Sequence, residues 1–235
     1  MKVVPMIFNT EMVKALLDGR KTVTRRPAKN LSFSERVGFI VGEWAYGLGW
    51  NFRETMNNCI RSKSAKCPAQ IGDLIYVRET FTTDPDVDHD SWNDHELSYV
   101  EWVGCEMSSQ FLPEALKANK HCLYKADCKI DMKWTPSIHM PRWASRLTLK
   151  VTDVRIERVQ DISEEEAIKE GINKHHQLPA FKSPIGYHTS PAYAYEELWN
   201  SIYGNWDENP YVWVIEFEVI HQNVDEHIES VKDAE

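Results

Sequence analysis

The stretch Leu16-Leu-Asp-Gly-Arg-Lys-Thr-Val-Thr-Arg-Arg-Pro27 decides the expected fold. Apolar residues recur at helical spacing from Met12 to Leu17, which predicts an amphipathic helix with Thr10 as its N-cap. Gly19 stands where the end of a helix favours a residue with positive φ. Polar and β-branched residues then alternate from Lys21 to Arg26, which predicts a strand that ends at the proline. A helix therefore leads through a glycine turn into a cationic strand.

The expected strand has two faces, because side chains alternate along a strand. A threonine hydroxyl becomes a nucleophile when a base takes its proton, and a lysine acts as that base when burial or nearby cations lower its pKa. Lys21 and Thr24 are therefore a candidate base and nucleophile, provided that the chain leaves the regular strand near Thr22. One face carries Lys21, Val23 and Arg25. The other face carries Thr22, Thr24 and Arg26.

The segment Gly19-Arg-Lys-Thr-Val-Thr-Arg-Arg26 resembles the Gly-x-Lys-Thr-x-Thr-x-Arg signature of ASCH domains, which have a PUA-like β-barrel fold. Two further blocks, Trp134–Arg146 and Tyr211–Phe217, resemble the phage and prophage subgroup of that family. The resemblance implies an α+β fold, namely a PUA-like mixed β-barrel with flanking helices and large loop insertions. The expected organisation is one domain over residues 1–221, insertions at about 28–68, 81–120 and 172–190, and an acidic, disordered tail over 222–235.

The resemblance also implies a catalytic set. Small bacterial ASCH proteins that hydrolyse N4-acetylcytidine are understood to use a lysine, a threonine three residues later and a glutamate in a later helix. Lys21 and Thr24 match the first two by motif, and Glu170 matches the third by its place in the helix that Ser163 is expected to cap. A carboxylate in the last turn of a helix is disfavoured by the helix dipole, so Glu170 needs a nearby cation or a function.

A second group of residues is expected to contact a nucleoside or a single-stranded RNA or DNA element. The loop Trp134–Arg146 interleaves aromatic and cationic residues, as base stacking and phosphate contact require, although a rigid loop with packed tryptophans fits equally well. Arg78 and Glu79 belong to a strand that the resemblance places beside the signature, or else form an exposed ion pair. The full set is Arg20, Arg25, Arg26, Arg78, Glu79, Trp134, His139, Arg142 and Trp143.

The insertions allow two interpretations each. In the first, Trp44 and Trp50 are expected to pack on the barrel, with base stacking as the alternative. In the second, the acidic residues 84–114 are expected to form a solvated loop or lid, with a calcium site as the alternative. The third insertion contains His175, His176 and His188. These histidines are expected to be exposed loop residues and not metal ligands, because carboxylate or thiolate partners at ligand spacing are missing. We therefore expect no metal and no cofactor.

Composition limits the function classes. The chain has 235 residues, 42% hydrophobic residues and a net charge of −9, which argues against a general nucleic-acid coat. No apolar run approaches the ~20 residues that a membrane span needs. A cytoplasmic protein is therefore expected, with its five cysteines reduced. Three functions remain: binding of a nucleoside or nucleic-acid element, an amidohydrolase for N4-acetylcytidine-type nucleosides, and a phage accessory protein that binds a protein partner.

Overall fold

The computed structural model describes residues 1–47, 51–83, 117–129 and 133–233, so Trp50 and the acidic segment 84–114 lie outside the described residues. The chain divides into two compact units. Unit 1 comprises Met1–Val4, Ala15–Leu74 and Leu149–Val219, and unit 2 comprises Pro5–Lys14, Ile75–Thr148 and Ile220–Glu235. Helices and strands occur in both, which confirms the expected α+β class.

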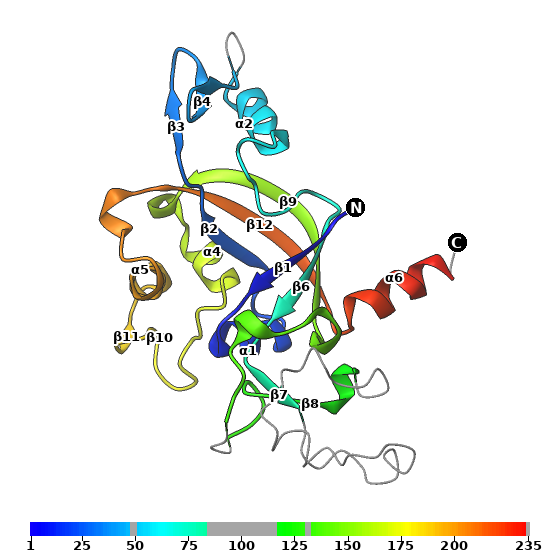
Figure 1. Ribbon diagram of the computed structural model, residues 1–235. Helices are drawn as coiled ribbons and strands as arrows, with labels where there is room; N and C mark the ends of the chain where they lie inside the picture. The colour runs from blue at the N-terminus through cyan, green and yellow to red at the C-terminus, as the bar shows by residue number, and fades with distance from the viewer. Residues whose placement is uncertain (48–50, 84–116, 130–132, 234–235) are drawn as a thin grey trace, which may run out of the picture. The chain divides into compact units, whose positions relative to one another are not determined.

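The sheet of unit 1 contains three neighbouring strands, in the order β9 (Thr148–Arg158), β12 (Tyr211–Ile220) and β2 (Val23–Pro27) (Figure 1). Strands β12 and β2 are antiparallel, and Ile215 lies opposite Thr24. The apolar run at the start of β12 is buried on both faces, as expected for a strand covered on two sides. The signature strand therefore lies against a buried strand.

Two helices cover this sheet in unit 1, α4 (Glu164–Lys169) and α5 (Pro191–Ile202), with the hairpin β10 (Phe181–Lys182) and β11 (Tyr187–His188) between them in the chain (Figure 1). The expected capping box starts α4, because the Ser163 hydroxyl accepts the backbone N–H of Glu166, and the Glu166 carboxylate accepts that of Ser163. Tyr195 and Trp199 of α5 pack in one core with Val23 and Val214.

The insertion at about 28–68 contains β3 (Leu31–Ser34), β4 (Gly38–Val41), β5 (Trp44–Ala45) and α2 (Phe52–Arg61), and its three strands pair antiparallel as a hairpin with a short third strand. Phe39 packs against Phe33 and Phe52, with ring centroids 5.1 and 5.4 Å away. Trp44 was expected to pack, and this is wrong, since its side chain is 70% exposed. It belongs to the outer, two-residue strand of the hairpin, and the phenylalanines already fill the aromatic core.

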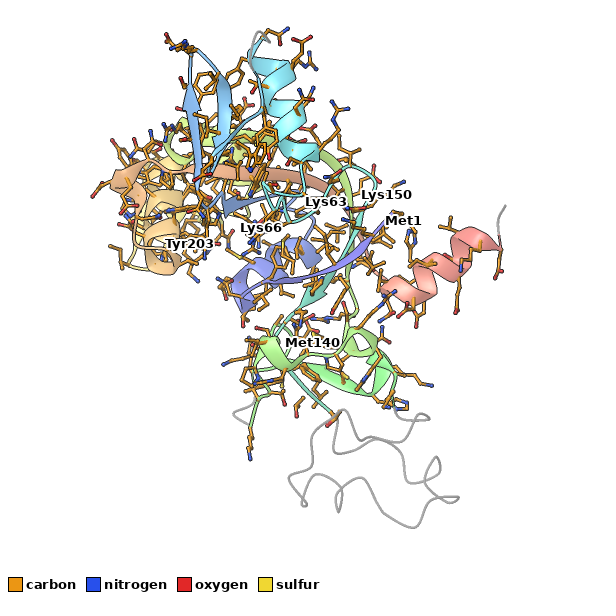
Figure 2. All side chains as sticks on the ribbon, turned by 45° about the horizontal axis from the view of Figure 1, so that its top comes forward. Met1, Lys63, Lys66, Met140, Lys150 and Tyr203 are labelled. Carbon is orange, nitrogen blue, oxygen red and sulfur yellow. The ribbon has the colours of Figure 1, made fainter. Side chains whose placement is uncertain are left out.

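Unit 2 contains most of the neighbouring strands β1 (Val3–Ile7) and β6 (Leu74–Arg78), and the pair β7 (Phe81–Thr83) and β8 (Cys122–Tyr124). Its core includes Phe81, Tyr124 and Met140, the last of which is labelled in Figure 2. The helix α1 (Thr10–Leu17) begins one residue earlier than expected, because Asn9, and not Thr10, caps it by accepting the backbone N–H of Met12. Short 3₁₀ turns lie at Asn119–His121, Ser137–His139 and Arg142–Ala144 in unit 2, and at Val159–Asp161 and Trp206–Glu208 in unit 1.

The expectation of a disordered tail is wrong over α6 (Val224–Lys232). Asn223 caps this helix by accepting the backbone N–H of Asp225, and its amide nitrogen donates to the carbonyl oxygens of Arg142, Trp143 and Ser145. Acidic residues in the first turn suit the positive end of the helix dipole. The cap and these long-range hydrogen bonds order a segment whose composition alone suggests disorder.

Within the described ranges no helix has the length and apolar character that crossing a membrane requires. The strands described form open sheets and no closed barrel, so the PUA-like barrel stays a prediction.

Candidate functional site

Lys21 is the most buried charged residue of the signature, with 0% of its surface exposed. Its Nζ donates to Glu170 Oε2 at 2.6 Å, to the Glu170 carbonyl oxygen at 2.8 Å and to the Val23 carbonyl oxygen at 2.8 Å. An ammonium group has three N–H donors, so all three have acceptors here. Burial lowers the pKa of Lys21 below its usual value, and the charge of Glu170 opposes this shift.

The chain reaches Lys21 by an irregular turn. The expectation of a regular strand over all of residues 21–26 is therefore wrong for Lys21 and Thr22. The backbone N–H groups of Arg20 and Lys21 both donate to the Ala15 carbonyl oxygen, and that of Thr22 donates to Lys169. The regular strand therefore begins only at Val23. The ammonium of Lys21 consequently lies beside the peptide group that joins Val23 to Thr24. This is the break in alternation near Thr22 that a Lys21–Thr24 pair requires.

Glu170 lies at the C-cap of α4 and is 3% exposed. The next residue, Gly171, has a φ of +97°, and a Cβ built there would lie 2.7 Å from Ala15 Cβ and 3.3 Å from Lys21 Cβ. Only glycine fits both the backbone conformation and this close approach. The end of α4 therefore packs directly on Lys21, and the lysine compensates a carboxylate that the helix dipole disfavours.

Arg25 connects this pair to a wider ion-pair network. Its Nη2 lies 2.9 Å from both Glu157 Oε2 and Glu166 Oε2, and its Nη1 lies 3.5 Å from Glu170 Oε1. The network is continued by Arg155, which binds Asp153, Glu157, Glu166 and Glu216. Three cations thus face five carboxylates. Since the Arg25 side chain is fully buried among acids, it cannot serve as a phosphate contact in this conformation.

The network shifts further pKa values. Burial would raise the pKa of Glu166, but Arg25 and the backbone N–H of Ser163 hold it below the usual value. Burial and the charge of Glu170 raise the pKa of Tyr195, so its phenol stays neutral. Within this network, the buried Nε–H of Arg25 has no acceptor among the residues described. The cluster therefore keeps one N–H group that could bind a ligand oxygen.

Sequence reasoning missed the partners contributed by β9. Asp153, Arg155 and Glu157 lie at i, i+2 and i+4 of one strand and so share a face. That spacing is a signal for a charged strand face, and it was available from the sequence. The contact of this strand face with Arg25 could not be derived from the sequence, because the two segments are more than 120 residues apart.

The remaining candidate residues lie in unit 2, apart from Arg20 and Arg26. Glu79 receives two hydrogen bonds from Arg146, from Nε at 2.9 Å and from Nη2 at 3.1 Å. Burial raises the pKa of Glu79, and Arg146 opposes this. Arg78 donates to the Ile138 carbonyl oxygen, and Arg142 pairs with Asp225. These charged groups have partners within their own unit, which weakens their role as phosphate contacts.

The loop of unit 2 is held mainly by packing. Trp143 packs on the core of that unit, Trp134 is half-buried, and His139 is exposed. The expectation that these residues contact a nucleoside or a nucleic-acid element stays a prediction. In unit 1, Arg20 pairs with Asp18 and donates to the Gly171 carbonyl oxygen.

A pocket of about 400 Å³ lies near the end of β2 in unit 1. Its lining includes Lys29, Arg158, Tyr203 and Tyr211, and the Arg158 guanidinium lies 3.8 Å from the centre of the Tyr211 ring. Arg26 Nη1 lies 3.5 Å from the Tyr203 hydroxyl, which links the signature to this pocket. Within the described part of the chain, neither Lys29 nor Arg158 has a carboxylate at ion-pair distance. The pocket thus carries cations that are not neutralised.

The described His, Cys, Asp and Glu side chains include no group of three or more that could hold a metal ion. Comparison of the chain with protein-family models, curated proteins and solved structures found no match of any of the three kinds.

Proposed function

We propose that unit 1 binds a nucleoside acylated on its exocyclic amine and hydrolyses that amide with Lys21, Thr24 and Glu170. The observation that carries the proposal is the 2.6 Å hydrogen bond between Lys21 Nζ and Glu170 Oε2, made by two buried residues that are 149 positions apart. The substrate class, N4-acetylcytidine, comes from the resemblance of the signature to ASCH domains, and the PUA-like barrel belongs to the same proposal.

The Lys21–Glu170 pair can supply both a base and an acid. Transfer of one proton from Lys21 Nζ to Glu170 Oε2 leaves a neutral amine and a neutral carboxylic acid. The charged pair is the resting form, and the burial that lowers the pKa of Lys21 reduces the free-energy cost of moving this proton. The pair therefore holds a lysine base beside the Val23–Thr24 peptide and a proton donor on the neighbouring oxygen.

The chemical step balances within these three residues. The neutral Lys21 amine takes the proton of the Thr24 hydroxyl, and the oxygen attacks the acyl carbon. The bond from that carbon to the exocyclic nitrogen breaks, and Glu170 protonates the nitrogen to release the free nucleoside. The charged pair is thereby restored, and water then hydrolyses the acyl-threonine ester to give acetate. The free Nε–H of Arg25 is a candidate donor to the acyl oxygen as negative charge develops on it.

The mechanism requires that the substrate reaches the buried Lys21–Glu170 pair. Lys21 and Glu170 are covered in the described conformation, and the Gly171 turn packs on the lysine. The substrate enters when the Gly171 turn moves away from Lys21. When the turn moves back, it excludes bulk water from the site.

The test measures cytidine released from N4-acetylcytidine by chromatography. Lys21→Arg removes the base, and Glu170→Gln removes the proton donor while preserving shape. Each is expected to lose about 100- to 10,000-fold in turnover, the usual contribution of a positioned acid or base. Lys169→Arg is the matched control, because this exposed lysine precedes Glu170 in the chain. A Lys21→Arg variant that is folded and as active as wild type excludes the mechanism.

A second candidate function, binding of a nucleic-acid element without catalysis, is favoured by the pocket with Lys29, Arg158, Tyr203 and Tyr211. Its unneutralised cations suit phosphate, and its tyrosines suit base stacking. Affinity for a short single-stranded RNA should then fall with salt, and Arg158→Gln should reduce the slope of log K against log salt by about 1. Lys150→Gln, at an exposed position outside the pocket, is the control and should leave the slope unchanged. A salt-independent or undetectable interaction excludes this candidate.

A further inference from the structure

Residues 53–72, which include most of α2, differ in charge from the rest of the chain. They contain two arginines, two lysines and one acid, Glu54, although the whole chain has 36 acidic residues and a net charge of −9. The Glu54 carboxylate accepts the backbone N–H of Asn51 in the capping box of α2, so it serves the start of the helix. A cationic segment in an acidic chain indicates a local site for an anionic partner.

One face of α2 is fixed against the hairpin of the insertion. Thr55 Oγ1 accepts the backbone N–H of Phe39 at 2.9 Å, which joins α2 to the neighbouring strand β4 (Figure 1). A Cβ built at Gly38 or at Gly47 would lie 2.2 Å from that oxygen, so the two glycines leave the space that Thr55 fills. Cys59, one turn further along the helix, is also buried. The other face of α2 is therefore the one that solvent reaches.

The exposed face of α2 is cationic. Arg53, Asn57 and Arg61 are spaced four residues apart, so they follow one another along one side of the helix, and all three are exposed. The Arg61 guanidinium donates to the Asn57 carbonyl oxygen at 3.3 Å and to Asn58 Oδ1 at 3.2 Å, both of which are neutral acceptors. The two arginines therefore present positive charge on the same side of α2.

Two exposed lysines, Lys63 and Lys66, extend this charge beyond the end of α2, and both are labelled in Figure 2. Their segment is ordered, because Ser62 Oγ donates to the Tyr46 hydroxyl at 2.6 Å and Lys66 N donates to the Lys63 carbonyl oxygen at 3.3 Å. Lys66 has a φ of +52°, a conformation that glycine adopts at lower cost. None of the two arginines and two lysines has a carboxylate at ion-pair distance among the residues that the structure describes.

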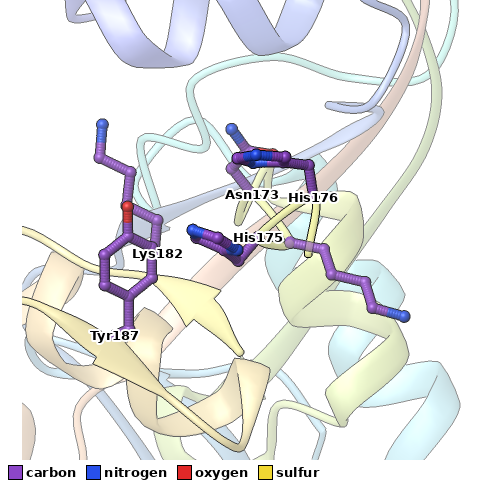
Figure 3. A pocket seen from close by; sticks show the side chains of 6 residues that line it. Asn173, His175, His176, Lys182 and Tyr187 are labelled. Carbon is purple, nitrogen blue, oxygen red and sulfur yellow. The ribbon is translucent and has the colours of Figure 1, made fainter. Parts of the chain in front are cut away.

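The pocket of about 310 Å³ beside β10 and β11 (Figure 3) is a different case, because its rings are held by contacts within the hairpin. His175 stacks on His176 with centroids 4.6 Å apart and meets the Tyr187 ring edge to face at 5.1 Å. His175 Nδ1 also accepts the backbone N–H groups of Gln177 and Leu178. These contacts account for the histidines without a ligand, so the charge on α2 is the stronger indication of a partner.

We propose that the α2 surface, which comprises Arg53, Arg61, Lys63 and Lys66, binds the phosphate backbone of double-stranded DNA. Clustered cations supply most of the affinity for such a backbone, because each contact releases counterions from it. An exposed helix favours DNA over duplex RNA, since an α-helix enters the major groove of B-form DNA, whereas the corresponding groove of A-form RNA is deep and narrow. The proposal depends neither on catalysis at Lys21 nor on the pocket near the end of β2.

Fluorescence anisotropy of a short labelled DNA duplex, titrated with the full chain from low to high salt, tests the proposal. The duplex is expected to bind, and log K should fall with log salt with a slope of about −3 to −4, because four phosphate contacts contribute about −0.9 each. A duplex RNA of the same sequence should bind more weakly. Absent or salt-independent binding of the DNA duplex overturns the proposal. RNA that binds as tightly as DNA, or polyglutamate that does, overturns the assignment of duplex DNA as the partner.

Variants locate the binding on the α2 surface. Arg53→Gln combined with Arg61→Gln should reduce the magnitude of the slope by about 2, and Lys63→Gln combined with Lys66→Gln should do the same. All four positions are exposed, so these substitutions should leave the free energy of unfolding nearly unchanged. A slope that neither pair of substitutions reduces overturns the proposal.

Control variants separate this surface from the other sites. Lys169→Gln combined with Lys232→Gln removes the same charge at exposed positions outside the α2 surface and should leave the slope unchanged. An equal reduction in this control overturns the proposal, since it shows an effect of net charge alone. A slope that only Arg158→Gln reduces assigns the binding to the pocket near the end of β2 and also overturns it. Lys21→Arg should leave duplex binding unchanged, so a failure of the catalytic proposal is distinguishable from a failure of this one.

Discussion

Lys21 and Glu170 form a pair whose two members depend on each other. Both are buried, and each charge is compensated mainly by the other and by Arg25. Removal of one partner from a buried pair leaves an uncompensated charge, whereas replacement of both by uncharged residues is often neutral. The sequence indicated both residues separately, the lysine by its motif and the glutamate by its unfavourable position in a helix. Their contact could not be derived from spacing, because it depends on how α4 ends.

The first prediction concerns the stability of this pair. Glu170→Gln should lower the free energy of unfolding by about 3–5 kcal/mol, since Lys21 stays buried and charged without its carboxylate. Adding Lys21→Met should restore most of that loss. Urea denaturation measures both, with the exposed Glu165→Gln as a control expected to change stability by less than about 0.5 kcal/mol. A Glu170→Gln variant as stable as wild type contradicts a charged pair.

Glu166 gives a prediction for pH. Its pKa in the folded protein lies below the usual value of 4.5, so the unfolded chain binds its proton more readily. The stability from this group is therefore fully present above pH 4.5 and is lost as the pH falls through the folded pKa. Glu166→Gln keeps the capping box, which accepts Gln, and removes the charge. Stability measured between pH 3 and 7 should fall less steeply below pH 4.5 in this variant, and identical slopes would refute the role of Glu166.

At the level of elements, the sequence predicted local structure well and tertiary contacts poorly. The helix α4 that Ser163 caps and the amphipathic helix α1 follow from nearby residues and were predicted, the second to within one residue of its start. The strand expected over residues 21–26 begins only at Val23, because the N–H groups of Lys21 and Thr22 donate to Ala15 and Lys169, and only the Thr22 carbonyl oxygen bonds to β12, at Phe217. The helix α6 was missed for a similar reason, since the amide of its cap bonds to carbonyl groups about 80 residues away.

The turn after α4 gives the prediction at this scale. Gly171→Ala should destabilise by more than Gly19→Ala, although both glycines have positive φ, because only at Gly171 would the new Cβ lie within 4 Å of other atoms. Positive φ alone costs about 1–2 kcal/mol for a residue with a side chain, and the steric overlap with Ala15 adds to it. Ala15→Gly combined with Gly171→Ala should recover the steric part. Equal losses at the two glycines, measured by thermal unfolding, would show that the close packing of α4 on Lys21 is absent.

Over the whole molecule, the distribution of charge matters more than its sum. The cations of the signature and of the loop in unit 2 mostly bind carboxylates or carbonyl oxygens, as Arg25, Arg142 and Arg146 do. Composition revealed the net charge of −9 but could not reveal which cations are neutralised. Lys29 and Arg158, which have no carboxylate at ion-pair distance among the described residues, line the pocket near the end of β2, which therefore is an expected place for an anionic ligand. The Lys21 site itself suits a neutral substrate.

Turnover of N4-acetylcytidine by two variants of Thr24 tests the central claim most directly. Thr24→Ser keeps a hydroxyl, and Thr24→Val keeps the shape of the side chain without the hydroxyl. Comparison of these two variants therefore isolates the contribution of the hydroxyl nucleophile. Wild type and Thr24→Ser should release cytidine, and Thr24→Val should not release it above the rate in buffer, while all three bind the nucleoside and unfold at similar temperatures. Release of cytidine by Thr24→Val at the wild-type rate, or no release by wild type, would contradict the account.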